Sequence, residues 1–307
     1  MKRYLITSSL FLLLCFLLLA PKTAAAAARD GLTLWYQNLV PVLFPFMILS
    51  NLMIRLDCIS ILLKFLHPLL HFVWGTSVYG SYAILAGFLF GYPMGAKVIG
   101  DLCQKELITP EEAEYLIGFV NNLSPAFLIT YLVGQNLKKP LLLHPTLCIL
   151  YGAPLISSIA FLPKYRKKIR ASSVNRKKAS RVPLQPELID ACIFDGIINI
   201  TRLGGYIMLF TLITGALSLL PFKHALVQCL ITGCIEITVG IQTICESTLP
   251  FFTKYLCLMM LCSFGGICAL LQTLSVYKMS RQTLFHYIKA KTLTMGIAAF
   301  MTLLLFL

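Results

Sequence analysis

One stretch decides the fold: Ala86–Ile129, AGFLFGYPMGAKVIGDLCQKELITPEEAEYLIGFVNNLSPAFLI. It begins as an apolar segment, breaks at Gly91-Tyr92-Pro93, crosses a polar elbow, and re-enters an apolar segment through Asn121-Asn122-Leu123-Ser124-Pro125. A soluble core does not need a lysine and paired asparagines within its most hydrophobic segments. Membrane transporters do, because they place binding sites at helices broken at membrane depth. The stretch therefore predicts a membrane protein with interrupted helices.

The composition points to the same class of protein. Of the 307 residues, 58% are hydrophobic and only 12% are charged, and the mean hydropathy is +0.82. Soluble domains carry about 25% charged residues. Apolar runs of about 17 residues or more recur, which is long enough for a helix to cross a bilayer, whereas a β-barrel would show short alternating segments. We expect an all-α polytopic membrane protein with about 8–10 membrane segments, some broken or re-entrant.

The net charge of +14 is concentrated in one run, with nine basic residues between Lys164 and Arg181. Positive-inside asymmetry explains this bias, and no basic groove interleaved with aromatics indicates a nucleic-acid partner. We expect residues 163–190 to form a basic cytoplasmic loop, which an anionic lipid surface could contact. The loop divides a first membrane half, residues 38–162, from a second, residues 191–307.

Residues 1–37 are expected to form an N-terminal transmembrane helix, or a signal-like segment, followed by a linker. The apolar run 4–20 follows Lys2-Arg3 and precedes Pro21 and an alanine run. A retained first transmembrane helix fits this pattern, and so does a cleaved signal peptide. The 11 cysteines of the chain form no C-x-x-C pair, so we expect buried thiols and neither a metal site nor a cofactor.

Polar residues at the two breaks of the first half are candidate substrate-binding residues. Lys97 lies just beyond Gly91-Tyr92-Pro93, near backbone groups freed by the break, or it snorkels from a helix end. Asn121, Asn122 and Ser124 precede a proline that also frees carbonyls. Their amides and hydroxyl would complete a hydrogen-bonding site, with interhelical contact as the alternative.

The second half opens with polar residues at helical spacing. Asp195, Asn199, Arg202 and Tyr206 follow one another by four, three and four positions, so they share a helix face. Opposite charges on one apolar helix indicate a polar interior seam, with an interfacial Asp195 as the alternative. We assign substrate binding to Arg202 and charge tuning or ion coupling to Asp195 and Asn199.

Glu236 lies among apolar residues between Gly233 and Gly240, and an intramembrane carboxylate is a functional candidate by default. It could bind a coupling cation (H⁺ or Na⁺), change protonation, hydrogen-bond a substrate, or pair with Arg202. The positive-inside rule favours placing the basic residues before and after this part of the chain on the same, cytoplasmic side. That placement requires the Glu236 stretch to enter and leave the membrane on one side, so it is predicted to be a re-entrant hairpin. Ser263 precedes Gly265-Gly266, a further break, and is also a candidate substrate-binding residue. The two halves thus form a weak repeat: GYPMG then NNLSP, and GCIEITVG then CSFGG.

Taken together, the motifs of the chain resemble the YlbJ-type sporulation integral membrane proteins. The motifs that carry the resemblance are Gly31-Leu-x-Leu-Trp35, Phe44-Pro45-Phe46-x-Ile48-Leu49-Ser50, Gly91-Tyr-Pro-x-Gly-Ala-Lys97, Asn121-Asn-x-Ser-Pro-Ala-Phe127, Glu236-Ile-Thr-x-Gly240 and Ser263-Phe-Gly-Gly266. They follow the same order over nearly the whole chain. The resemblance implies a nucleoside-recognition "gate" domain like that of concentrative nucleoside transporters.

The resemblance also implies a function. It predicts a non-enzymatic transporter of a small organic anion, dipicolinic acid, across the outer forespore membrane in support of cortex formation. A nucleoside-type transporter and a non-transport assembly protein of sporulation are the alternatives. Arg202 favours an anion, because arginine binds carboxylates in a bidentate fork.

Overall fold

The computed structural model describes residues 2–172, 184–220 and 224–306, and every element within these ranges is a helix. Six helices are long and apolar enough to cross a membrane, or up to seven if the pair His67–Trp74 and Val78–Phe90, bent by 96°, counts as one span. The six are Pro21–Arg55, Pro110–Leu137, Pro140–Arg166, Pro186–Leu217, Phe251–Val276 and Arg281–Phe306. With the shorter apolar helices Thr7–Leu19 and Ala225–Ile235, this confirms an all-α polytopic membrane protein.

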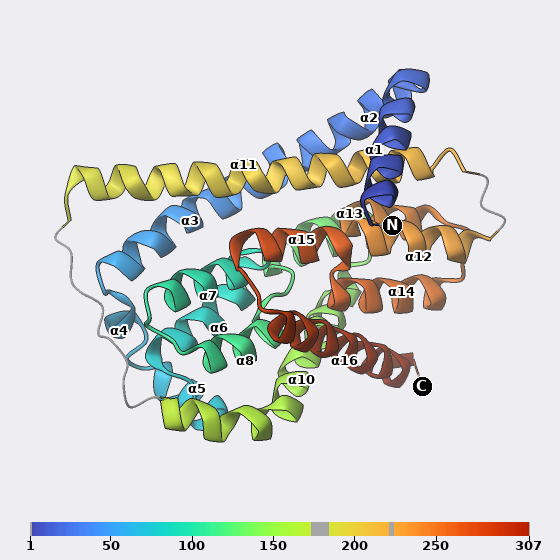
Figure 1. Cartoon of the computed structure of the whole chain (residues 1–307). Coiled ribbons are helices and arrows are strands. Elements are labelled where there is room, and N and C mark those ends of the chain that lie inside the picture. Colours follow the sequence, from blue (N-terminus) through green and yellow to red (C-terminus); the bar gives the residue numbers. More distant parts are fainter. Residues whose placement is uncertain (1, 173–183, 221–223, 307) are drawn as a thin grey trace.

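The order of elements repeats between the two halves (Figure 1). Each half has a long helix, a hairpin of two short helices, a broken helix and a further long helix. In the first half these are α2–α3 (Pro21–Thr33, Val40–Arg55), α6–α7 (Val78–Phe90, Met94–Gln104), α8 to η2 (Pro110–Val120, Leu128–Leu137) and α10 (Leu143–Ser172). In the second they are α11 (Pro186–Leu217), α12–α13 (Ala225–Ile235, Ile237–Glu246), α14–α15 (Phe251–Phe264, Gly266–Val276) and α16 (Arg281–Phe306).

The long helices of the two halves pack against their counterparts, and each hairpin packs against the broken helix of its own half. Helix α11 lies along α2 and α3, and α10 packs on α16 (Figure 1). The first hairpin contacts α8, and the second contacts α14. The predicted repeat is therefore a repeat of element order and of packing.

Both hairpins close on a pair of glycines. A Cβ built on Gly240 would lie 2.3 Å from the Gly233 Cα, and one built on Gly95 would lie 3.1 Å from the Gly87 Cα. Only glycine allows backbones to approach this closely. At 11 and 10 residues, α12 and α13 are each too short to span a bilayer. The stretch around Glu236 thus folds back on itself as a hairpin, and its re-entry into the membrane stays a prediction.

The N-terminal region differs in part from the expectation. α1 (Lys2–Leu19) covers the apolar run, but the alanine run is a helix, α2, and not a linker. It continues through η1 (Leu34–Leu39), a π-helix, into α3, which has Pro41 in its first turn. Proline cannot donate to the helical ladder, and the helix is irregular just before Pro41, where it forms a π-helical turn.

Two short helices, α4 (Ile59–Leu62) and α5 (His67–Trp74), connect α3 to the first hairpin. Within the broken helix, α9 (Pro125–Phe127) leads into η2, and η3 (Pro140–Leu142) precedes α10. Helix α10 continues through Pro163, so the helix does not end there as expected. One proline removes a single ladder bond, and a long helix tolerates it. The middle of the predicted basic loop, residues 173–183, lies outside the described residues.

Apolar side chains are exposed on the outer helices. Phe194 and Ile198 on α11 and Phe300 and Leu304 on α16 are each more than half exposed. Water would not favour such surfaces, whereas lipid does. Several buried polar side chains, among them Asn121, Glu236 and Ser263, lie at the breaks between helices.

Candidate functional site

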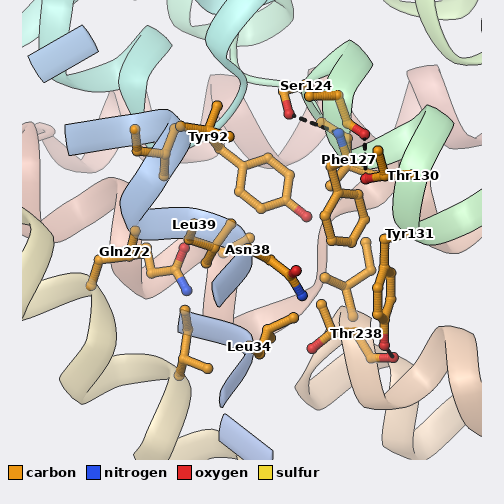
Figure 2. A pocket seen from close by; sticks show the side chains of 18 of the residues that line it. Leu34, Asn38, Leu39, Tyr92, Ser124, Phe127, Thr130, Tyr131, Thr238 and Gln272 are labelled. Atoms are coloured by element: carbon orange, nitrogen blue, oxygen red, sulfur yellow. Dashed lines mark hydrogen bonds between the residues drawn. The ribbon is translucent and has the colours of Figure 1, made fainter. Parts of the chain in front are cut away.

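A cavity of about 360 Å³ lies where the four breaks meet (Figure 2). Each break contributes a lining residue: Tyr92 before α7, Ser124 before α9, Glu236 before α13, and Cys268 in the first turn of α15. Four helices therefore begin at the cavity wall. Because a helix N-terminus carries roughly half a positive charge, the cavity lies in the positive field of four helix ends.

Glu236 is the N-cap of α13. Its Oε2 accepts a hydrogen bond from the Val239 backbone nitrogen at 2.8 Å and another from the Thr238 hydroxyl. The side chain is buried, and it is the charged residue among those that line the cavity. No contact with Arg202 is formed, so the pairing alternative is wrong: Glu236 satisfies donors of its own helix.

Tyr92 directs its ring into the cavity, as Figure 2 shows. Its hydroxyl is buried and has no hydrogen-bond partner within the described ranges, and the same holds for the Ser263 hydroxyl. Buried polar atoms are nearly always bonded, so such groups indicate a missing partner. Ser263, however, does not line the cavity, whereas Tyr92 does, so Tyr92 is the lining residue whose buried hydroxyl lacks a partner in the described ranges.

The other polar lining residues are amides, hydroxyls and a second tyrosine. Tyr131 donates from its hydroxyl to the Thr238 carbonyl at 3.1 Å, which joins η2 to α13. Asn38 and Gln272 reach the cavity from η1 and α15 (Figure 2). The full lining comprises Leu34, Gln37, Asn38, Leu39, Val42, Leu43, Phe90, Tyr92, Leu123, Ser124, Ala126, Phe127, Thr130, Tyr131, Gln135, Leu203, Ile207, Glu236, Ile237, Thr238, Cys268, Ala269 and Gln272.

Lys97 lies elsewhere, in an ionic network between α3, α7 and α11. Its ammonium donates to Asp101 at 2.7 Å, to Asp195 at 3.1 Å and to the Asn51 amide oxygen at 3.0 Å. Asn51 in turn donates to Asp195 at 2.5 Å, and Asn199 donates to the other Asp195 carboxylate oxygen at 3.2 Å. The carboxylates of Asp101 and Asp195 therefore compensate the charge of the Lys97 ammonium. Lys97 does not line the cavity.

Arg202 is exposed, and this corrects the expected interior seam. It donates to the Ser275 carbonyl at 3.1 Å, at the end of α15. The buried face of α11 is made by residues such as Ile200 and Leu203. The polar face with Asp195 and Arg202 therefore lies at the border of this buried face. Helical spacing groups residues on a face but does not say where that face points.

Asn121 and Asn122 form a second polar centre with Lys291 of α16, which is not among the predicted site residues. Asn121 donates to the Thr273 hydroxyl at 2.7 Å and to the Tyr287 hydroxyl at 3.2 Å. Lys291 donates to the Asn121 carbonyl and, at 3.1 Å, to the Asn122 amide oxygen. Neither asparagine lines the cavity, so of the predicted residues only Ser124 and Glu236 do.

Comparison with known proteins gives one informative match. No protein-family model matches the chain, and no solved structure matches it. The chain is similar to the sporulation integral membrane protein YlbJ of Bacillus subtilis (strain 168), with 26% identity over 299 residues that cover 85% of this chain and 72% of that protein. The similarity supports the resemblance seen in the motifs. The chain is thus an integral membrane protein that is similar, over most of its length, to YlbJ.

Proposed function

We propose that this chain is a sporulation-associated membrane transporter that binds a small polar solute in the cavity where the four breaks meet. The observation that carries the proposal is the convergence of four helix starts, which bring Tyr92, Ser124, Glu236 and Cys268 to one cavity. Transporters built from repeats make their solute sites from such discontinuous helices. The association with sporulation rests on the similarity to YlbJ.

The proposed solute is a small organic anion, with dipicolinic acid as the first candidate. Arg202 does not support this choice, because it is exposed and bonded to Ser275. The support comes from the four helix N-termini, whose combined partial charge exceeds the single negative charge of Glu236. Glu236 would then change its protonation when a carboxylate enters the cavity. The resemblance implies that the protein lies in the outer forespore membrane.

A nucleoside-type solute is the second candidate, favoured by the neutral polar lining. Asn38, Gln272 and the Tyr92 hydroxyl offer donors and acceptors suited to an uncharged ring with hydroxyl groups. The nucleoside-recognition gate domain implied by the resemblance remains a prediction.

Uptake into proteoliposomes tests the proposal. We expect the purified protein to take up labelled dipicolinate or uridine, Arg202→Ala to retain uptake, and Glu236→Gln to change its dependence on pH. Uptake of neither solute by a folded protein would contradict the transporter proposal and favour an assembly role.

A further inference from the structure

Lys291 is a buried cation without an acidic partner. It is 3% exposed, in the middle of α16. Lys97, by contrast, pairs with the carboxylates of Asp101 and Asp195. Because an isolated buried ammonium is costly, the oxygen atoms that surround it must replace its water.

These oxygens belong to the first broken helix. α8 ends at Val120, so its last carbonyls have no partner in the next turn. Lys291 donates to the Asn121 carbonyl and to the Asn122 amide oxygen, while the amide oxygen of Asn121 is buried with no hydrogen-bond partner in the described part of the chain. The site is oxygen-rich and lies at the negative end of a helix, where a cation is favoured.

We propose that the Lys291 ammonium is a tethered cation that fills the oxygen cage formed by the Asn121 carbonyl and the amide oxygens of Asn121 and Asn122. Broken-helix carriers otherwise coordinate a coupling metal ion in such a cage, so the tethered ammonium makes this carrier independent of Na⁺. In such carriers, unwound carbonyls and helix C-terminal ends hold the coupling ion. The inference rests on the proposed transport function, and it assigns the place of the coupling cation to the Lys291 ammonium.

The second half shows the contrast expected from this assignment. At the break between α14 and α15, the Ser263 hydroxyl is buried without a partner in the described ranges. The ring of Tyr92, which comes from the first half and has a hydroxyl that also lacks a partner there, lies beside Gly265 of this break. Ala153 lies as many residues from the start of α10 as Lys291 does from the start of α16, the corresponding helix. Both residues are buried, but Ala153 carries no charge. One break is thus permanently occupied by a positive charge, and the other leaves polar groups free for an exchangeable ligand.

There is room beside Lys291 for a small ion to replace its ammonium. A second cavity, of about 100 Å³, adjoins it and is lined by Phe264, Gly266, Ile267, Leu270, Tyr287, Ile288 and Lys291. Shortening the side chain to alanine would join this cavity to the oxygen cage. The cage would then be open to Na⁺ or to methylammonium.

The test is the melting temperature of the purified protein, without solute, in Na⁺, methylammonium or N-methyl-D-glucamine chloride at equal ionic strength. We expect Lys291→Ala to melt below wild type in N-methyl-D-glucamine and to recover by about 5 °C in saturating Na⁺ or methylammonium. Lys289→Ala, an exposed lysine on the same helix, is the matched control and should respond to no cation. Lys291→Met fills the space without the charge, so it should be destabilised and not recover.

Three results would overturn the proposal: specific stabilisation of the wild type by Na⁺, a Lys291→Met protein as stable as wild type, or a folded Lys291→Ala protein that responds to no cation. The first needs no variant, so the proposal stays testable if Lys291→Ala does not fold. The measurement uses no solute, so its outcome is separate from that of the uptake experiment.

Discussion

At the scale of single residues, the cavity separates groups that hold the fold from groups that are free to bind. Glu236 does both, since one carboxylate oxygen caps α13 while the residue lines the cavity. Tyr92 has no structural bond through its hydroxyl within the described ranges. These two residues therefore give opposite expectations for stability.

Replacing Glu236 with alanine should cost stability as well as binding. The lost cap destabilises α13 by about 1 kcal/mol, whereas Glu236→Gln keeps an acceptor oxygen and should stay close to wild type. Thr109→Ala is the matched control: Thr109 caps α8 by accepting from the Glu112 nitrogen at 3.2 Å, far along the chain from the cavity lining. It should lower the melting temperature similarly and leave solute binding unchanged. If Glu236→Ala were as stable as wild type, the capping role of Glu236 would be contradicted.

Tyr92→Phe should weaken solute binding and leave the melting temperature unchanged or slightly raised. The substitution removes a hydroxyl that is buried without a partner, so no bond within the described protein is lost, while a solute would lose a hydrogen bond, about tenfold in affinity. Tyr115→Phe is the control, because its hydroxyl donates to the Ser158 carbonyl at 3.1 Å. It should cost about 1 kcal/mol of stability and nothing in binding. Isothermal titration and thermal unfolding separate the two patterns.

At the scale of elements, the glycine pairs make the hairpins possible. Gly240→Leu should destabilise the protein by about 1–3 kcal/mol, because even its Cβ would lie 2.3 Å from the Gly233 Cα and would force α12 and α13 apart. Gly296→Ala in α16 is the control, since its Cβ would meet nothing within 4 Å. It should stabilise by up to about 1 kcal/mol through helix propensity. A Gly240→Leu protein that melts like wild type would show that the hairpin is not closely packed.

The breaks were predictable from sequence because each places glycine, proline or a polar residue inside an apolar run, and these disrupt a helix by known means. Gly91 and Gly265 adopt φ angles of +75° and +96°, as such positions require. What faces the cavity was not predictable. Arg202 shares a helix face with Asp195, but the direction of that face depends on the packing of α11 on α3. Lys291 was not predicted as a site residue, because the Asn121 carbonyl that it contacts is 170 residues away in the sequence.

At the scale of the whole molecule, Lys97 ties the first hairpin to α3 and α11. Lys97→Met would leave Asp101 and Asp195 facing each other without their cation. Breaking a buried pair costs about 3–5 kcal/mol, but the Asp195 side chain is 40% exposed, so we expect about 2 kcal/mol. Lys105→Met, at the exposed end of the same helix, should change stability by less than about 0.5 kcal/mol. Similar unfolding curves for the two variants would contradict this role.

The repeat also explains why the cavity lies where it does. Two hairpins and two broken helices, one of each per half, meet with their interrupted ends together, so the cavity belongs to neither half alone. Movement of one half against the other would change access to the cavity without rebuilding it.

The central claim, that this cavity is the solute site, is tested most directly by thermal unfolding titrated with dipicolinate and with uridine. We expect at least one solute to raise the melting temperature of wild type and of Arg202→Ala, and Tyr92→Phe to need about tenfold more solute for the same rise. A rise that is lost in Arg202→Ala but kept in Tyr92→Phe would contradict the account and move the site to the exposed edge of α11.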